Sequence, residues 1–351
     1  MAEKMLVTPW EVKGEIDYDK LTKQFGTEKI DKKLLDRIKK HTDDLHFMLK
    51  RNVFFSHRDM NWLLDRYEAH HKFVLYTGRG PSGNTTIGHI LPWTFTKWLQ
   101  DKFKCDLYFQ LTDDEKFLFK KDINLFQTNS YAHENMLDVI ALGFKPKKTQ
   151  FLIDTENVDV LYPIALKVAK HITYSTAKSV FGFKDSSNIG QIFYTAMQSA
   201  PAFLPSVLRN DEVPVLIPLA IDQDPHFRVT RDVAPKLGYP KPAIIHSMFL
   251  PGLQPGGKMS ASDPLSTIYT TDTPESVKKK ISRAFSGGKE SVEEHRRKGG
   301  NPDIDVPFQY LRMLFEPDDK KLSRIYDDYK SGKMLSGELK QICTEKIVQF
   351  L

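Results

Sequence analysis

The segment Phe73–Pro92, which reads FVLYTGRGPSGNTTIGHILP, constrains the fold more than any other stretch of this chain. Its apolar and aromatic beginning, Phe73–Tyr76, is typical of a buried strand. The glycines that follow permit tight turns and let a ligand approach the backbone, and from Ile87 the apolar spacing becomes helical. A helix that opens against such a loop presents unpaired N–H groups, so we expect this element to bind an anion such as phosphate.

Two interpretations fit the loop. Its three glycines have the G-x-G-x-x-G spacing of a dinucleotide-binding fold, although Pro81 lies inside the motif and the helix begins late. Alternatively, Pro81–Gly83 followed by Thr86–His89 resembles the nucleotide site of class I aminoacyl-tRNA synthetases, in which a Pro-Ser-Gly loop leads into a Gly-His pair at a helix N-terminus. The remainder of the chain has to distinguish the two.

Composition narrows the class of protein. The 351 residues are 40% hydrophobic and 27% charged, with a formal net charge of +6; the length allows two domains, and the charge favours a polyanionic partner without establishing one. The two cysteines, Cys105 and Cys343, indicate neither a disulfide framework nor a zinc site, and no His, Cys and carboxylate set has metal-ligand spacing. No apolar run approaches the about 18 residues of a membrane span, and no signal region opens the chain, so we expect a cytoplasmic protein.

Further apolar runs predict a parallel sheet. Strands are expected at four more segments, namely Leu107–Leu111, Thr149–Ile153, Val213–Ile221 and Ala243–Met248. They alternate with helical segments, so we predict an α/β fold with a Rossmann-like parallel sheet and right-handed crossovers.

Three regions are predicted along the chain. Residues 1–70 are expected to form an N-terminal helical extension, in which Ser56–Asp59 resembles a capping box before a helix. Residues 71–270 form the Rossmann-type domain, with a helical insertion at about 156–205. Residues 271–351 form an all-helical C-terminal domain, whose basic clusters Lys278–Lys280 and Arg296–Lys298 are solvated faces or contacts to nucleic acid.

Polar clusters follow four of the five predicted strands, with the sequences TGRGPSG, TDDEK, DQD and GGKMSAS. Open parallel sheets bind ligands outside the carboxyl ends of their strands, so we expect these four loops to meet at one crevice. The last loop, Lys258–Ser262, provides a cation and two hydroxyl groups, which suit a triphosphate.

Several side chains in these loops have two interpretations. His89 at the helix start is either a structural hydrogen-bonding group or a donor to phosphate, and Arg79 is either solvated or a contact to phosphate or ribose. Glu115, beside Lys116, is either part of a helix cap or a partner for a ligand ammonium group.

Amides form a second group of candidates. Gln198 lies among apolar residues, and because buried polar groups need partners, a ligand is one candidate partner. Gln223 offers an amide that can read an amino acid. Gln110 and Tyr76 lie at strand ends that face the same crevice, with Tyr76 at least partly in the core.

Six segments carry a resemblance that covers nearly the whole chain: FFSHRDMN (54–61), YTGRGPSG (76–83), FTKWLQDKF (95–103), QLTDDEK (110–116), AIDQDPHFRVTRDVAPKLGYPKPA (220–243) and KMSASDP (258–264). Together they resemble tryptophanyl-tRNA synthetases of the eukaryotic and archaeal type. The chain departs from the pattern at Thr86, where the first signature histidine stands in many relatives, and at Ala261, where others have lysine. It is also expected to lack part of the C-terminal helical domain.

The resemblance implies a two-step reaction. L-Tryptophan and Mg·ATP give tryptophanyl-adenylate and pyrophosphate, and the tryptophanyl group then passes to tRNA(Trp). It implies catalytic roles for His89, Lys116, Lys258 and Ser260. It further implies tryptophan contacts at Tyr76, Gln110, Glu115, Gln198 and Gln223, and ATP contacts at Arg79, Gly80, Gly88, His89, Lys258, Met259, Ser260 and Ser262.

The resemblance also implies functions for whole regions. The C-terminal helices would bind the anticodon arm, the insertion at 156–205 would carry a homodimer contact, and Val7–Trp10 would fold over the ATP site. A tyrosyl-tRNA synthetase remains the nearest alternative, although Gln110 favours an indole over a phenol. An NAD-dependent oxidoreductase, with Asp113 or Asp114 as its ribose-binding acid, and a catalytically silent nucleic-acid-binding protein are more distant alternatives.

Overall fold

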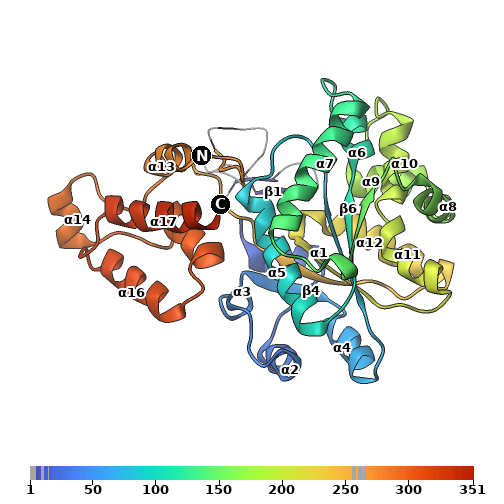
Figure 1. The fold of residues 1–351 in the computed structure, drawn as a ribbon, viewed down its shortest axis with the longest axis horizontal. Helices are drawn as coiled ribbons and strands as arrows, with labels where there is room; N and C mark the ends of the chain where they lie inside the picture. The colour runs from blue at the N-terminus through green and yellow to red at the C-terminus, as the bar shows by residue number, and fades with distance from the viewer. Residues whose placement is uncertain (1–4, 9–11, 15, 255–257, 260–263, 265) are drawn as a thin grey trace.

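The computed structural model describes residues 5–8, 12–14, 16–254, 258–259, 264 and 266–351. A seven-stranded sheet with the order β3-β4-β9-β8-β5-β6-β7 forms its centre (Figure 1). The strands are β3 (Glu28–Lys29), β4 (Phe54–Arg58), β5 (Val74–Arg79), β6 (Leu107–Leu111), β7 (Thr149–Ile153), β8 (Val215–Ala220) and β9 (Ala243–Ser247). Two short strands, β1 (Leu6–Val7) and β2 (Val12–Lys13), pair separately.

The five strands predicted from apolar runs are β5 to β9, and neighbouring members of this set pair in parallel. The prediction of a Rossmann-like parallel sheet is therefore confirmed. β5 lies between β6 and β8, so the chain builds the sheet outward from β5 on one side and later on the other. Such a switch point leaves a crevice outside the carboxyl ends of the two central strands.

Helices cover the sheet and form the remaining regions. Before β5 lie α1 (Tyr18–Phe25), α2 (Lys32–Thr42), α3 (Phe47–Lys50) and α4 (Met60–Glu68). Between β5 and β9 lie α5 (Ile87–Phe103), α6 (Asp113–Phe119), α7 (Leu125–Ala141), η1 (Pro146–Lys148), α8 (Val158–Ala169), α9 (Tyr174–Phe181), α10 (Ile189–Met197), α11 (Ala200–Arg209), η2 (Ile221–Gln223), α12 (Asp224–Val233) and η3 (Ala234–Leu237). The C-terminal helices are α13 (Pro274–Ser282), α14 (Val292–Lys298), α15 (Val306–Tyr310), η4 (Leu311–Phe315), α16 (Asp319–Lys330) and α17 (Ser336–Phe350).

The N-terminal region differs from the predicted helical extension, because β3 and β4 belong to the central sheet. β4 pairs antiparallel with β9, and Ser56 lies within it rather than in a helix cap. Asp59, directly before α4, has a left-handed backbone conformation and makes no side-chain cap bond. The capping-box prediction is therefore wrong. Pairing with β9 determines the conformation of Ser56, whose hydroxyl lies 3.1 Å from His246 Nδ1.

α7 begins at Leu125 with a reciprocal side-chain cap. The Asn124 side chain accepts a hydrogen bond from the Gln127 N–H, and the Gln127 side chain accepts one from the Asn124 N–H, both at 2.9 Å. This reciprocal cap satisfies two N–H groups that the helix leaves unpaired. Apolar spacing alone does not reveal such a start.

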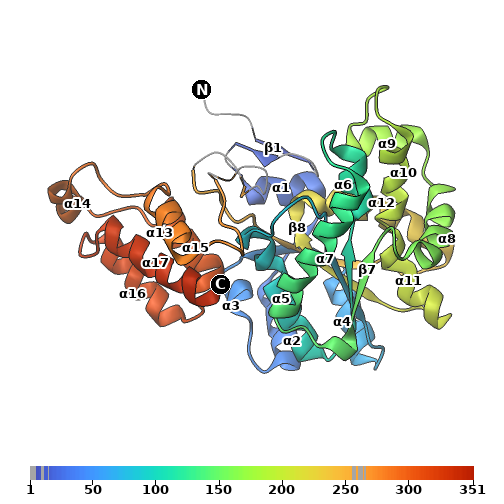
Figure 2. The ribbon, with the colours of Figure 1, turned by 45° about the horizontal axis from the view of Figure 1, so that its top comes forward.

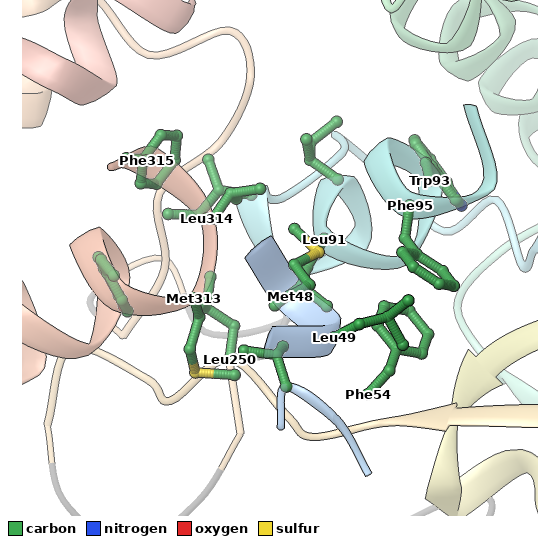
Figure 3. Packing of buried hydrophobic residues seen from close by; sticks show 14 of the residues in the cluster. Met48, Leu49, Phe54, Leu91, Trp93, Phe95, Leu250, Met313, Leu314 and Phe315 are labelled. Atoms are coloured by element: carbon green, nitrogen blue, oxygen red, sulfur yellow. The ribbon is translucent and has the colours of Figure 1, made fainter. Parts of the chain in front are cut away.

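The C-terminal helices form a lobe beside the sheet, on the side opposite α8 and α10 (Figures 1 and 2). One continuous apolar core joins this lobe to α3 and α5, with Met313 and Leu314 facing Met48 and Leu250 (Figure 3). Burying such side chains contributes about 1.5–3 kcal/mol each, so the contact fixes the lobe to the α/β region. Among the helices described, none combines the length and the apolar character that crossing a bilayer requires.

Candidate active site

A buried polar network lies at the carboxyl end of β5 and β6. The Tyr76 hydroxyl donates to Gln110 Oε1 at 2.5 Å, and Gln198 Nε2 lies 2.7 Å from Tyr76 Oη and 3.0 Å from Gln110 Oε1. The hydroxyl of Tyr194 donates to Gln198 Oε1. The structure thus brings together Tyr76 and Gln110, which were predicted to face the same crevice, and Gln198, for which a ligand was the predicted partner.

The amide nitrogen of Gln110 donates to both carboxyl oxygens of Asp154, at 2.9 and 3.0 Å. Asp154 directly follows β7 and is 1% exposed. Asp154 is not among the predicted site residues, because the prediction included the polar loops after only four of the five strands. The signal was present, since DTEN follows the predicted strand Thr149–Ile153 just as the other polar loops follow theirs.

Glu115 and Lys116, in the first turn of α6, lie against the glycine loop. Glu115 accepts from the Thr112 hydroxyl at 2.8 Å and pairs with Lys116 Nζ at 2.6 Å. A Cβ at Gly80 would lie 2.0 Å from Lys116 Cε and 2.6 Å from Glu115 Oε2. A side chain at position 80 would therefore displace the ends of Glu115 and Lys116 from their present positions.

His89 occupies the first turn of α5. Its Nδ1 accepts from the Thr86 N–H at 3.2 Å and lies 2.9 Å from the Thr86 hydroxyl. Burial, and then the nearby cations Arg79, Lys258 and Lys116, lower the pKa of His89 well below its usual range. The ring is therefore neutral, with Nδ1 as an acceptor and Nε2 carrying the proton, so Nε2–H can donate to an anion at the start of α5.

Arg79, at the end of β5, is 5% exposed. Its guanidinium donates to the carbonyl oxygens of Gly83 and Asn84, at 2.9 and 2.8 Å. Burial lowers the pKa of Arg79 to about 10, which still leaves it charged at neutral pH. This arrangement holds the glycine loop in place and keeps a positive charge beside His89.

Lys258 approaches the same region from the loop after β9. Its ammonium group pairs with Asp222 and lies 5.7 Å from the centroid of the Phe249 ring. The neighbouring Met259 is buried, and a Cβ at Gly88 would lie 3.5 Å from Met259 Cβ. The loop after β9 therefore contacts the N-terminal turn of α5, as predicted from the two motifs.

Other predicted site residues are placed less directly. Gln223 is half-buried just before α12, next to the buried Asp222. Ser260 and Ser262 lie outside the described residues, as do Pro9 and Trp10, so their assigned roles stay predictions.

The geometry of Asp113 argues against the dinucleotide interpretation. This carboxylate accepts from the Thr155 N–H at 3.2 Å and from the Thr155 hydroxyl at 2.5 Å, and it is fully buried. It holds the turn after β7, so its oxygens already accept from protein donors. α5 also begins only at Ile87, four positions beyond the last glycine of the motif.

Comparison with known proteins agrees with this geometry. The sequence model of the family described as "tRNA synthetases class I (W and Y)" matches residues 68–351. The chain belongs to this family. The tryptophan–tRNA ligase of Saccharolobus solfataricus is 52% identical over 353 residues, which cover 100% of this chain and 91% of that protein. The cytoplasmic tryptophan–tRNA ligase of Homo sapiens is 50% identical over 359 residues, covering 98% of this chain and 76% of the human protein.

Solved structures place this class I synthetase in the same group. A tryptophanyl-tRNA synthetase from Encephalitozoon cuniculi, solved with tryptophan, superposes with a TM-score of 0.87 at 42% identity and covers 96% of this chain and 92% of its own. A product-bound parasite tRNA synthetase superposes with a TM-score of 0.92 at 44% identity, and the superposition covers 96% of this chain and 91% of that one. The synthetase therefore falls in the tryptophan branch of the family rather than the tyrosine branch, and the oxidoreductase alternative is wrong.

Proposed function

We propose that this synthetase activates L-tryptophan with ATP and transfers the tryptophanyl group to tRNA(Trp). The observation that carries the proposal is the Tyr76–Gln110–Gln198 network, which lies at the switch point of the sheet beside the cationic start of α5. A buried acceptor oxygen suits the single N–H of an indole. The names of the relatives support the same amino acid.

The amino acid would lie between the network and α6. Gln110 Oε1 and Tyr76 Oη would contact the indole N–H, since these two oxygen atoms lie next to each other in the network. Glu115 would attract the ammonium group, and the amide oxygens of Gln198 and Gln223 would complete its hydrogen bonds. This arrangement leaves the tryptophan carboxylate directed toward the glycine loop and the start of α5.

In the first step, a carboxylate oxygen of tryptophan attacks the α-phosphorus of ATP. A new P–O bond forms, the bond to the bridging oxygen breaks, and pyrophosphate leaves with the electron pair. The protein contributes position and charge rather than a covalent group. His89 Nε2–H, Lys116 and Lys258 would stabilise the negative charge that builds up on the phosphate oxygens.

The remaining ATP contacts would come from backbone and loop atoms. Gly80 and Gly88 would allow close approach of the phosphates, and Arg79 would contribute charge from beneath the loop. Met259 would support the loop, while Ser260 and Ser262 would donate to phosphate oxygens. Mg²⁺ would enter as part of the substrate complex, carried by the phosphates of ATP, which is how enzymes usually hold this ion.

Other partners follow from surfaces away from the crevice. The C-terminal helices would bind the anticodon arm, because Lys278 and Lys279 on α13 and Arg297 on α14 are exposed cations. On α8, Val158, Tyr162 and Leu166 are 50%, 45% and 47% exposed at helical spacing, and this apolar stripe in the insertion would meet a second copy of the chain. We place the protein in the cytoplasm, as the name of the human relative does for that protein.

Pyrophosphate exchange tests the central proposal. Labelled pyrophosphate should enter ATP in the presence of L-tryptophan and not in the presence of L-tyrosine. Transfer to tRNA(Trp) should follow with the same amino acid. Exchange that depends on tyrosine alone would contradict the proposal.

A further inference from the structure

The hydrogen bonds of the Tyr76–Gln110–Gln198 network run in a single direction. Tyr194 donates to the oxygen of Gln198, and Gln198 Nε2 donates to Gln110 Oε1. Gln110 Nε2 in turn donates to Asp154, which is hydrogen-bonded to Asp114. Each group offers a donor to the next, so the orientation of every amide depends on the acceptor at the end of the chain.

The orientation of the Gln110 amide determines whether a donor or an acceptor is available to the amino acid substrate. Its side chain is fully buried, and the two ends of a glutamine amide have opposite hydrogen-bonding character. In the reversed orientation, Gln110 Oε1 would face the oxygens of Asp154, while its NH₂ group would face the NH₂ group of Gln198. Leaving buried polar groups mismatched in this way costs about 1–3 kcal/mol each, so the acceptor at Asp154 selects one orientation.

We propose that Asp154 is a positioning residue that turns the acceptor oxygen of Gln110 toward Tyr76 and Gln198 and so makes the site select an amino acid whose side chain carries an N–H donor. This inference rests on the proposed activation of tryptophan. Asp154 need not touch the substrate, since it acts through the amide of Gln110.

The neighbours of Asp154 indicate how it stays an acceptor toward Gln110 without becoming an isolated buried charge. Burial and the charge of Asp114 raise the pKa of Asp154 well above its usual range, and burial raises the pKa of Asp114 to about 6. Asp113 raises both pKa values further, and Glu115 that of Asp114. These shifts favour a proton on Asp154 that is shared with Asp114, and both oxygens of Asp154 lie within hydrogen-bond distance of Gln110 Nε2, so an acceptor oxygen remains for the amide. An asparagine can reproduce both bonds, with Nδ2 toward Asp114 and Oδ1 toward Gln110; a leucine can reproduce neither.

The test compares tryptophan with 3-benzothienyl-L-alanine, in which sulfur replaces the indole N–H. We would measure kcat/KM for pyrophosphate exchange with each amino acid and take the ratio, because loss of folded enzyme cancels in it. For the wild type, kcat/KM should be about 10-fold or more higher with tryptophan, which corresponds to the free energy of one hydrogen bond. Asp154→Asn should keep this ratio within about threefold, whereas Asp154→Leu should reduce it to within about threefold of unity.

Matched variants separate positioning from simple destabilisation. Asp305→Leu removes another buried aspartate, which accepts from the Gly287 N–H and the Tyr329 hydroxyl in the C-terminal lobe rather than from Gln110, and it should leave the ratio unchanged. The side chain in Asp154→Ser is also too short to bond Gln110, and this variant is made in parallel. The ratio can then still be measured if the leucine variant does not fold.

Two results would overturn the inference while the proposed function stands. In the first, Asp154→Leu and Asp154→Ser lower exchange with both amino acids equally and keep the ratio. In the second, Asp154→Asn loses discrimination as completely as Asp154→Leu. A wild-type protein that shows no exchange with tryptophan overturns the proposed function itself, and with it this inference.

Discussion

Replacing Lys258 with alanine should slow adenylate formation by about 100-fold and leave tryptophan binding intact. Lys258 is the cation of the loop after β9, paired with Asp222 and close enough to His89 to lower its pKa. A unit charge at about 4 Å from a phosphate oxygen contributes about 4 kcal/mol at an effective dielectric constant of 20. Because the Lys258 side chain is 31% exposed, we reduce this contribution to about 3 kcal/mol, which corresponds to about 100-fold in rate.

The assay is a single-turnover measurement of tryptophanyl-adenylate by rapid quench, with the affinity for tryptophan measured separately by calorimetry. The affinity should change less than about twofold, because no bond of the Tyr76–Gln110–Gln198 network involves Lys258. Lys280→Ala is a matched control: Lys280 also pairs with an aspartate, Asp272 at 2.6 Å, and its Nζ lies 4.8 Å from the centroid of the Tyr269 ring, but on α13. A rate reduced less than threefold, or an equal reduction in the control, would refute the reasoning.

Three further predictions concern stability, assembly and tRNA. Burial, and then the positive charges of Arg51 and Lys50, lower the pKa of His46 to about 4, whereas the unfolded chain has a pKa of about 6.5. The contribution of neutral His46 to the free energy of unfolding should therefore be fully present above about pH 6.5. It should fall by up to roughly 3 kcal/mol toward pH 4. In urea unfolding, the free energy of unfolding of His46→Asn should fall less steeply with decreasing pH than that of the wild type. Asparagine keeps the cap on α3 that His46 provides. Equal slopes against pH in the two proteins would count against this assignment. Leu166→Asp on the exposed stripe of α8 should convert a dimer to a monomer in light scattering. Val292→Asp on α14, which also replaces an exposed apolar side chain, should not. A dimer that persists in Leu166→Asp would place the contact elsewhere. Replacing Lys278 and Lys279 with alanine should raise the KM for tRNA several-fold and reduce the salt dependence of this KM, since each phosphate contact releases about one counterion. The rate of pyrophosphate exchange should stay unchanged. An unaltered KM would show that these lysines do not contact tRNA.

The parallel part of the fold could be predicted because strands buried on both faces appear as continuous apolar runs. β4 could not, since FFSHR mixes apolar and polar residues and becomes a strand only by pairing with β9. Local pattern carries no information about such a partner, which lies far away in the sequence.

The candidate site was predictable to a similar extent. Gln198 stood out because a polar residue among apolar ones needs a partner, and its partners Tyr76 and Gln110 had been expected at the same edge of the sheet. The direction of their hydrogen bonds could not be predicted, because it depends on Asp154, and this residue is 44 positions from Gln110 along the chain. Which end of an amide faces a pocket is a property of the assembled network rather than of any local motif.

The antiparallel pairing of β4 with β9 also has a consequence for solubility. The family match begins at residue 68, after β4, yet β4 covers the backbone of β9 from Ile244 to Ser247. A fragment that starts at the family boundary would expose this row of N–H and C=O groups as an open edge, the kind of surface that recruits strands from other molecules. The fragment would also lack Arg58. Its partner Asp224, which is fully buried, would then lose the cation that pairs with it. We expect such a fragment to aggregate, so the first strands of this chain protect the sheet as well as extend it.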